Sequence, residues 1–191
     1  FQVIKTLTNA MENLHKKEKL EHMNQILSDL YVRDSVTGLY NRMGYQKLSI
    51  SYFTIMREKK MPVLVMFIDL DRLKYINDTF GHEYGDFAIV SIAKAMLKHC
   101  DADAIAARTG GDEFIVLEGA KDEESGRVLA QKIRTELSKT QRAMQLPFDL
   151  GASIGAVVAH PGEENVLESY VKRAEMLMYE EKAEKKVSRD S

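Results

Sequence analysis

Acidic side chains occur at two places that are predicted to be the end of a strand and a turn beside a sheet. Asp69 follows the apolar run 63–68, and Asp112 and Glu113 follow a Gly-Gly pair. Burying a carboxylate costs free energy unless a cation or a donor compensates it. If the two segments are neighbouring strands, the carboxylates converge on one hard cation, and such oxygen ligands suit Mg²⁺ carrying substrate phosphates. Either motif alone is more often a turn with solvated acids, but together they favour phosphoryl or nucleotidyl transfer.

Alternating helices and strands are predicted to position these acids. The apolar run before Asp69 is rich in β-branched residues and predicts a buried strand, and the Gly-Gly pair between two apolar segments predicts a hairpin. The strands are predicted at 63–71, 104–109, 114–117 and 148–159. The helices are predicted at 41–60, 122–139 and 164–186, and the segment 81–85 leads into a further predicted helix through residues 87–97. This order predicts an α/β (α+β) fold with a central, mostly antiparallel sheet flanked by helices.

The first 32 residues contain neither Gly nor Pro and predict a separate helix. Their apolar residues form two quartets with 3-4-3 spacing, and the charged run 16–19 breaks the register between them. These residues are Ile4, Leu7, Met11, Leu14, Leu20, Met23, Leu27 and Leu30. The pattern favours a signalling helix that pairs with a second copy, and an amphipathic helix packed on its own domain is the alternative. The chain is thus divided into the helix 1–32, a catalytic domain 33–187 and a tail 188–191.

Composition restricts the partners and the compartment. The 27 Lys and Arg residues nearly balance the 29 Asp and Glu residues, so a net charge of -2 gives no general attraction to nucleic acid. The single cysteine, Cys100, cannot form an internal disulfide and fits a reducing compartment, so a cytoplasmic location is expected. The chain begins at Phe1 rather than Met. We therefore expect an upstream sensor, and a membrane anchor in the parent protein is compatible with this.

Several motifs in order carry a resemblance to one family. The turn Arg108-Thr109-Gly110-Gly111-Asp112-Glu113-Phe114 resembles the signature of GGDEF domains. Also similar are Asp34-x-x-Thr37-Gly38-Leu39-x-Asn41-Arg42 and Phe67-x-Asp69-x-Asp71-x-x-Lys74-x-Ile76-Asn77-Asp78-x-x-Gly81-His82-x-x-Gly85-Asp86. Later matches are Ser153 and Gly155, with Val157 in place of an alanine, then Ala174-Glu175 and Tyr179-x-x-Lys182. The resemblance covers residues 34 to about 186.

The resemblance implies a fold related to the adenylate cyclase and polymerase palm cores. It implies a diguanylate cyclase, which joins two GTP molecules into cyclic di-GMP and releases two pyrophosphates. Asp69 and Asp112 correspond to the ligands of Mg²⁺, or of Mn²⁺, with the Leu70 carbonyl as a further ligand. Glu113 corresponds to a metal ligand or to the base that acts on the ribose 3′-hydroxyl.

The resemblance also implies residues that bind the nucleotide. Gly110 and Gly111 leave the backbone free to approach the α-phosphate. Asn77 and Asp86 correspond to the guanine-binding residues, and Asp86 favours guanine over adenine. The residues implied near the phosphates are Leu70, Asp71, Arg72, Leu73, Lys74, Lys182 and Lys186, together with His82. His82 is more simply interpreted as a hydrogen-bonding residue of the local turn, and Lys186 replaces an arginine of the family, so a solvated helix end is its equal alternative.

A further departure concerns regulation. Many members of the family carry Arg-x-x-Asp where this chain has Asp101-Ala102-Asp103-Ala104, which predicts weak or absent product inhibition at that site. Because one site holds one GTP, two domains must meet as a homodimer, and proximity is a large part of the rate enhancement. The competing functions are a GTP-binding or regulatory module without turnover and a cyclase with a mixed purine product.

Overall fold

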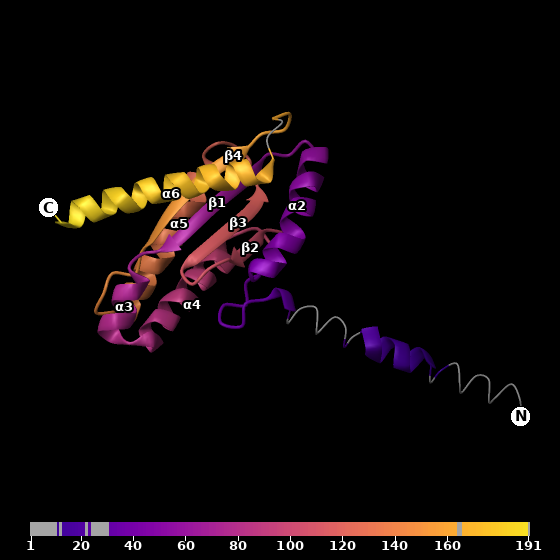
Figure 1. Cartoon of the computed structure of the whole chain (residues 1–191), viewed down its shortest axis with the longest axis horizontal. Coiled ribbons are helices and arrows are strands. Elements are labelled where there is room, and N and C mark those ends of the chain that lie inside the picture. Colours follow the sequence, from indigo (N-terminus) through magenta and orange to yellow (C-terminus); the bar gives the residue numbers. More distant parts are fainter. Residues whose placement is uncertain (1–10, 12, 22, 24–30, 164–165, 191) are drawn as a thin grey trace, which may run out of the picture.

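The computed structural model describes residues 11, 13–21, 23, 31–163 and 166–190, the last two of these without their side chains. The described residues between 11 and 23 are helical, and most of the predicted N-terminal helix, including Ile4, Leu7, Leu27 and Leu30, lies outside the described residues. In Figure 1 the helical segment projects away from the compact part of the chain. The rest of the described chain forms the folded domain, which begins with a short turn and a β-bridge between Arg33 and Tyr40.

Four antiparallel strands form a single sheet in the described part of the chain. The strands are β1 (Val63–Leu70), β2 (Ile105–Arg108), β3 (Glu113–Gly119) and β4 (Ala152–Ala159). Their order across the sheet is β2-β3-β1-β4, so β1 lies between β3 and β4. The predicted antiparallel sheet and the hairpin through the Gly-Gly pair are therefore confirmed. The unbroken apolar run of β1 is explained by its central place, because both of its faces are covered.

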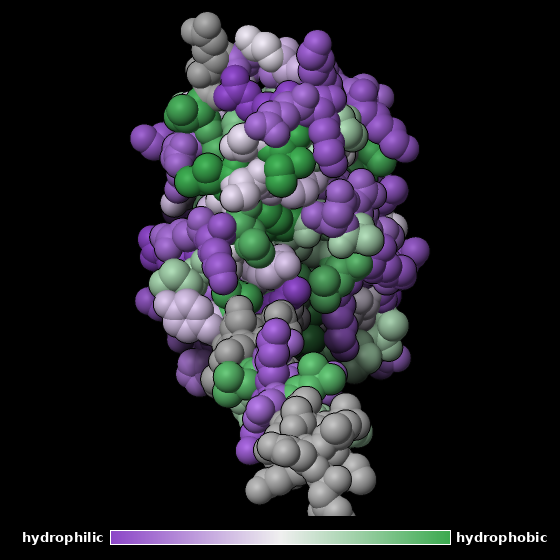
Figure 2. Space-filling view, turned by 90° about the vertical axis from the view of Figure 1, so that its right-hand side faces the viewer, coloured by the Kyte–Doolittle hydropathy of each residue, from purple (hydrophilic) through white to green (hydrophobic). Residues whose placement is uncertain are grey.

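Helices cover both faces of the sheet (Figure 1). The helices are α2 (Arg42–Glu58), α3 (Leu73–Phe80), α4 (His82–His99), α5 (Ser125–Ala143) and α6 (Leu167–Asp190). One core cluster joins α3, α4 and α5 to one face, and a second joins α2 and α6 to the other. Figure 2 views the molecule from the α2 side, where hydrophobic patches lie among hydrophilic side chains. The mixed α/β architecture predicted from the sequence is confirmed.

Local signals explain several helix ends. The side chain of Asn41 accepts a hydrogen bond from the Gly44 N–H at 2.8 Å and thereby caps α2, as predicted. The same side chain donates to the carbonyl oxygens of Tyr31 and Arg33, at 2.9 and 3.1 Å. Asn41 therefore joins the segment that precedes the domain to the first domain helix.

The extent of several elements differs from the sequence predictions. Helix α3 was not predicted, because its eight residues are too few for a clear periodicity and the segment has the composition of a turn. Strand β4 begins at Ala152 rather than at Phe148, since residues 148–151 form a loop after Pro147. Helix α6 continues to Asp190 and so includes most of the predicted tail.

The alternation of side chains along β1 decides which helices face the acids. Leu64, Met66 and Ile68 belong to the cluster with α4 and α5, whereas Val63, Val65 and Phe67 belong to the cluster with α2 and α6. By the two-residue period of a strand, Asp69 falls on the second face. Asp69, which follows the apolar run, is therefore directed toward α6.

Candidate active site

The predicted meeting of the two acidic segments is present. In the antiparallel register of β1 and β3, Asp69 lies opposite Glu113. One residue further along, the Leu70 N–H donates to the carbonyl oxygen of Asp112 at 2.9 Å. The Gly-Gly turn is closed by the N–H of Thr109, which donates to the Glu113 carbonyl at 3.0 Å. Strand pairing thus fixes the backbone of Asp112 beside that of Leu70.

Asp69 is buried and holds a lysine from a distant part of the chain. Its side chain is 7% exposed, and its Oδ1 accepts a hydrogen bond from Lys182 Nζ at 2.6 Å. Burial raises the pKa of Asp69, and the negative charges of Asp112 and Asp71 act in the same direction against the effect of Lys182. Burial opposes the charge of Lys182, but Asp69, Asp112 and Asp71 outweigh it and raise the pKa of that ammonium. Three carboxylates therefore lie close enough to Lys182 to stabilise its positive charge.

These residues fit a divalent cation. Two carboxylates, Asp69 and Asp112, and the backbone of Leu70 supply the oxygen donors that Mg²⁺ and Mn²⁺ take. Burial, followed by the charges of Asp112 and Asp71, raises the pKa of Asp69, and a cation bound there would stabilise its charged form. Within the described residues no three acidic, histidine or cysteine side chains form a ready cluster for a metal ion. The carboxylate of Glu113 lies over Gly110, with its Oε2 only 2.6 Å from where a Cβ on that glycine would be.

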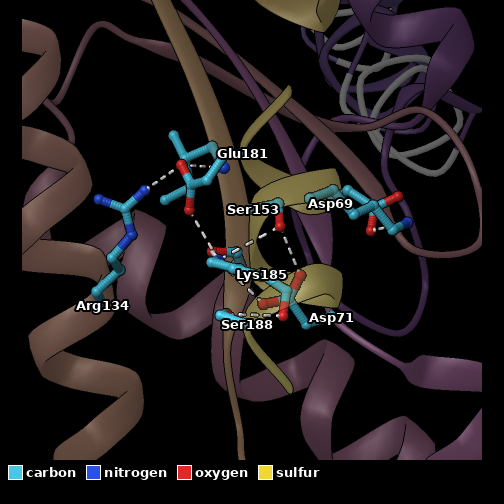
Figure 3. Close-up of polar contacts among 10 residues, drawn as sticks. Asp69, Asp71, Arg134, Ser153, Glu181, Lys185 and Ser188 are labelled. Atoms are coloured by element: carbon cyan, nitrogen blue, oxygen red, sulfur yellow. Dashed lines mark hydrogen bonds and ion pairs between the residues drawn. The ribbon is translucent and has the colours of Figure 1, made fainter. Parts of the chain in front are cut away.

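Asp71 is held by a separate group of side chains (Figure 3). Its Oδ1 accepts from Ser153 Oγ at 2.7 Å, and its Oδ2 lies 3.1 Å from Lys185 Nζ. Lys185 also contacts Glu181 at 2.7 Å, and Glu181 contacts Arg134 of α5 at 2.6 Å. This group joins the end of β1 to β4, α6 and α5. Asp71 is consequently directed at Lys185 and Ser153.

The chain turns sharply between Asp71 and α3. Arg72 adopts a left-handed backbone conformation with φ 61°, which is uncommon outside glycine, and its guanidinium lies 3.9 Å from the centre of the Tyr75 ring. Helix α3 begins at the next residue, so the free N–H groups of its first turn point toward the corner. The sequence prediction of a phosphate-binding turn at 70–74 therefore corresponds to a tight turn and a helix N-terminus.

A pocket of about 540 Å³ opens at this corner. It is lined by Asp71, Arg72, Leu73, Lys74, Asp112, Lys182, Lys185 and Lys186. Five of these eight residues are basic and two are acidic, which suits a polyanion accompanied by a cation. The pocket unites segments that are more than 100 residues apart in the chain.

Other predicted residues lie outside the lining of this pocket. Asp69 and Leu70 are buried behind it, and Gly110, Gly111 and Glu113 form the neighbouring turn. Asn77 on α3 lies against Gly85, because a Cβ on Gly85 would be 1.9 Å from the Asn77 Oδ1. Asp86, the next residue of α4, is exposed. The two predicted guanine-binding residues are thus on neighbouring helices.

The side chain of His82 is exposed at the start of α4 and forms no hydrogen bond with another described residue. The interpretation of His82 as a hydrogen-bonding residue of the local turn is therefore wrong. Gly81 makes this turn instead: with φ 95° it accepts a backbone hydrogen bond from the Tyr84 N–H at 3.2 Å.

Three residues with contacts at the site had no role assigned from the sequence. Lys185 lines the pocket, and its position four residues after Glu181 and three after Lys182 places all three on one side of a helix. Ser153 and Arg108 belong to matched motifs, but their partners, Asp71 and Asp34, are known only from the folded chain. Helical spacing was the signal available for Lys185.

The model of the diguanylate cyclase GGDEF domain matches residues 31–188, which is most of the chain. The chain belongs to the GGDEF family. The matched residues thus include all those that line the pocket, namely residues 71–74, Asp112 and the three lysines of α6.

Relatives of this GGDEF domain differ in their named activities. Diguanylate cyclase DgcP of Escherichia coli K12 is 32% identical over 172 residues, which are 88% of this chain and 49% of that protein. Cyclic di-GMP phosphodiesterase NbdA of Pseudomonas aeruginosa is 27% identical over 165 residues, which are 86% of this chain and 21% of that protein. The chain thus spans between about a fifth and a half of these relatives.

A solved structure supports the fold. The coiled coil and GGDEF domain of DgcB from Caulobacter crescentus, in complex with c-di-GMP, superposes with a TM-score of 0.75 over 92% of this chain and 93% of that chain, at 22% identity. At this identity the likeness concerns the fold alone. Within the described residues, no helix is both long and apolar enough to cross a lipid bilayer.

Proposed function

We propose that this GGDEF domain is a diguanylate cyclase that condenses two GTP molecules into cyclic di-GMP and two pyrophosphates. The observation that carries the proposal is the pocket in which the turn at residues 71–74, Asp112 and the lysines of α6 come together. Acidic groups for a cation and basic groups for phosphates are needed together in nucleotidyl transfer, and this pocket has both.

Asp69 and Asp112, with the Leu70 carbonyl, are the proposed ligands of Mg²⁺, and Mn²⁺ suits the same oxygen donors. A bound divalent cation supplies charge that stabilises the phosphates and favours ionisation of the attacking 3′-hydroxyl. Glu113 lies at the start of β3, opposite Asp69, from which it can act on the hydroxyl proton or join the ligands. The backbone pairing of Leu70 with Asp112 keeps the two segments in register.

The triphosphate is proposed to lie in the pocket. The backbone N–H groups of Leu73 and Lys74 begin α3 and have no partner inside that helix, so they can donate to phosphate oxygens. Lys182 and Lys186 add positive charge from α6. Gly110 and Gly111 leave the backbone of the signature turn accessible beside Asp112.

Guanine is proposed to bind between α3 and α4. The amide of Asn77 and the carboxylate of Asp86 offer both donors and acceptors, which match the edge of guanine. A base that lacks these groups would leave the side chains unsatisfied, so adenine is disfavoured. His82, exposed at the start of α4, is a further proposed contact with the nucleotide.

A homodimer is proposed to bring two such sites together, since the 3′-hydroxyl of one GTP must attack the α-phosphate of the other. The described helical residues Met11, Leu14, Leu20 and Met23 are exposed and apolar, which supports pairing through the N-terminal helix. Deleting residues 1–30 is expected to abolish activity at concentrations where the remaining domain is monomeric. Unchanged activity under those conditions would remove the role of the helix.

The function is tested with purified protein, Mg²⁺ and GTP, ATP or both, with the products identified by mass spectrometry. Cyclic di-GMP from GTP alone is expected, and a mixed product would indicate a different purine cyclase. The matched control is Asp112→Ala, which removes one proposed metal ligand and should abolish synthesis. Cyclic di-GMP formation by Asp112→Ala would contradict the metal assignment.

A protein fused to a leucine zipper is included so that a monomeric sample is not mistaken for an inactive domain. If the zipper fusion binds GTP without forming any product, the domain is a GTP-binding module. That result would refute the proposed catalytic activity.

A further inference from the structure

Lys182 and Lys185, one helical turn apart on α6, pair with Asp69 and Asp71 at the end of β1. The surroundings of the two lysines differ. Lys182 Nζ contacts Asp69 Oδ1 at 2.6 Å. Lys185 Nζ contacts Asp71 Oδ2 at 3.1 Å. The spacing of two residues along the strand end and three along the helix aligns the two pairs side by side.

Lys185 is fixed by several partners. Besides Asp71, its ammonium group donates to the Ala152 carbonyl at 2.7 Å and lies 3.3 Å from Ser153 Oγ. It also pairs with Glu181, which Arg134 holds from α5. Figure 3 shows Lys185 between Glu181 and Asp71, with Asp69 to one side of this group. Moving Lys185 would break several contacts and leave the carboxylate of Asp71, which is 6% exposed, without its cation.

Lys182 is held by a single partner among the described residues, Asp69. Its side chain is 41% exposed and lines the pocket, whereas that of Asp69 is 7% exposed. The ammonium can therefore leave toward the pocket without crossing the protein interior. Asp69 has no comparable freedom, because it lies at the end of the central strand.

Lys182 is bonded to an oxygen that the proposed function assigns to a divalent cation. A divalent cation takes carboxylate oxygens at about 2.0–2.6 Å, and an ammonium group at hydrogen-bond distance from the same oxygen would be repelled by it. The pocket beside Lys182 is the place proposed for the triphosphate, so the displaced ammonium has an anionic partner within the same cavity.

We propose that Lys182 is an exchangeable cation: it neutralises Asp69 in the free protein and moves to a nucleotide phosphate when a divalent cation binds Asp69. Lys185 stays on Asp71 throughout. This inference rests on the proposed function, because it requires Asp69 to be a metal ligand. It makes binding of the metal and of the triphosphate interdependent. The metal takes Asp69 from Lys182, and the triphosphate gives the released Lys182 a new anionic partner.

The test measures Mn²⁺ binding to the full chain without nucleotide, by calorimetry and by the electron paramagnetic resonance of free Mn²⁺. Lys182→Met is expected to tighten Mn²⁺ binding by roughly 5- to 150-fold, the usual range of coupling between two sites. Lys186→Met is the matched control, because it removes the same charge from the same pocket and Lys186 makes no ion pair with another described residue. It should change Mn²⁺ affinity much less.

A non-hydrolysable GTP analogue provides the second measurement. It should tighten Mn²⁺ binding strongly in the unaltered protein and weakly in Lys182→Met, because the exchange has been removed. Lys182→Gln should behave like Lys182→Met, and thermal unfolding verifies that each variant is folded.

Equal Mn²⁺ affinities of the unaltered protein and both Lys182 variants would overturn the exchange. An equal gain in Mn²⁺ affinity in Lys182→Met and Lys186→Met would also overturn it, because that result would indicate a general effect of charge. Asp69→Asn separates the two proposals. If Asp69→Asn leaves Mn²⁺ binding unchanged, the metal site is wrong and so is the exchange. If Asp69→Asn abolishes Mn²⁺ binding but Lys182→Met has no effect on it, only the exchange is refuted.

Discussion

The guanidinium of Arg108 joins the carboxylate of Asp34 to the carbonyl oxygen of Gly111. Nη1 lies 3.3 Å from Asp34 Oδ1, and Nη2 donates to Gly111 at 2.7 Å. Burial disfavours the charge of Asp34, but hydrogen bonds from Thr37 and the charge of Arg108 together lower its pKa. Asp34 lies where the chain enters the domain, and Gly111 lies in the signature turn. Arg108 therefore connects these two segments directly.

Arg108→Lys is expected to lower the rate of cyclic di-GMP synthesis while GTP still binds. Lysine keeps the charge but cannot reach both partners with a planar fork. A hydrogen bond to a charged group contributes about 1.5–3 kcal/mol, which corresponds to a loss of roughly ten- to a hundredfold in rate. Initial rates and GTP affinity are to be compared with those of Arg33→Lys. Arg33 lies next to Asp34 but donates to the Gly38 carbonyl rather than to the signature turn. A full rate in Arg108→Lys would show that the connection is dispensable.

Gly155→Ala is expected to destabilise the domain. A Cβ at Gly155 would lie 1.9 Å from the carbonyl oxygen of Ala174, so the backbone of α6 would have to move away from β4. Overpacking of this kind costs ~3 kcal/mol, which lowers the melting temperature by roughly 6–12 °C in a protein of this size. Gly119→Ala is the control, because its Cβ would meet only the flexible ends of Met56 and Met61. Equal melting temperatures of the two variants would refute the close packing.

Gly85→Ala is expected to weaken GTP binding without loss of stability. Its Cβ would displace the side chain of Asn77, whereas alanine within a helix is favoured over glycine by about 1 kcal/mol. A double-mutant cycle with Asn77→Ala isolates the effect, because Gly85→Ala should weaken GTP binding no further once the Asn77 amide is gone. Additive losses of affinity would place the effect elsewhere.

Glu118→Gln is expected to stabilise the protein at neutral pH. Glu118 is 8% exposed, and burial raises its pKa above the ordinary value of 4.5 against the hydrogen bond from the Asp101 N–H. The folded state therefore holds the Glu118 proton more tightly than the unfolded state, and the stability from this group is lost as the pH rises through its folded pKa. Glutamine keeps an acceptor for Asp101 without the charge.

Melting curves from pH 4 to pH 8 check this prediction. The gain in melting temperature of Glu118→Gln should be present at neutral pH and should disappear below the ordinary pKa of Glu, where both variants are neutral. The exposed Glu184, changed to Gln, should show no such dependence. A gain that is constant with pH would contradict the assignment to the charge of Glu118.

Cyclic di-GMP is expected to inhibit this domain weakly or not at all at Asp101. The exposed carboxylates of Asp101 and Asp103 lie near the buried Glu118 and would repel the phosphates of the product. Calorimetry with cyclic di-GMP measures this directly, and Asp101→Arg combined with Ala104→Asp should introduce inhibition. Tight product binding beside Asp101 in the unaltered protein would contradict this expectation.

Much of the local structure was determined by the sequence alone. The unbroken apolar run of β1, the Asn41 cap and the Gly-Gly hairpin depend on neighbouring residues, so their patterns predicted the elements that formed. The segments that line the pocket were also predicted, because the acids and the turn occur in recognisable motifs. Helix α3 was missed since a single short helix between two turns carries little periodic signal.

Only the tertiary structure decided how the charges of the site are paired. Lys182 and Asp69 are 113 residues apart, and Lys185 and Asp71 are 114 apart. Their pairing depends on β1 lying beside β4 and on α6 packing across both strands, which no local pattern contains. The sequence by itself determined which residues have the chemistry of the site. Burial of the aspartates and the docking of α6 decided which lysine neutralises which aspartate, because an ion pair needs its partners within a few ångströms in space.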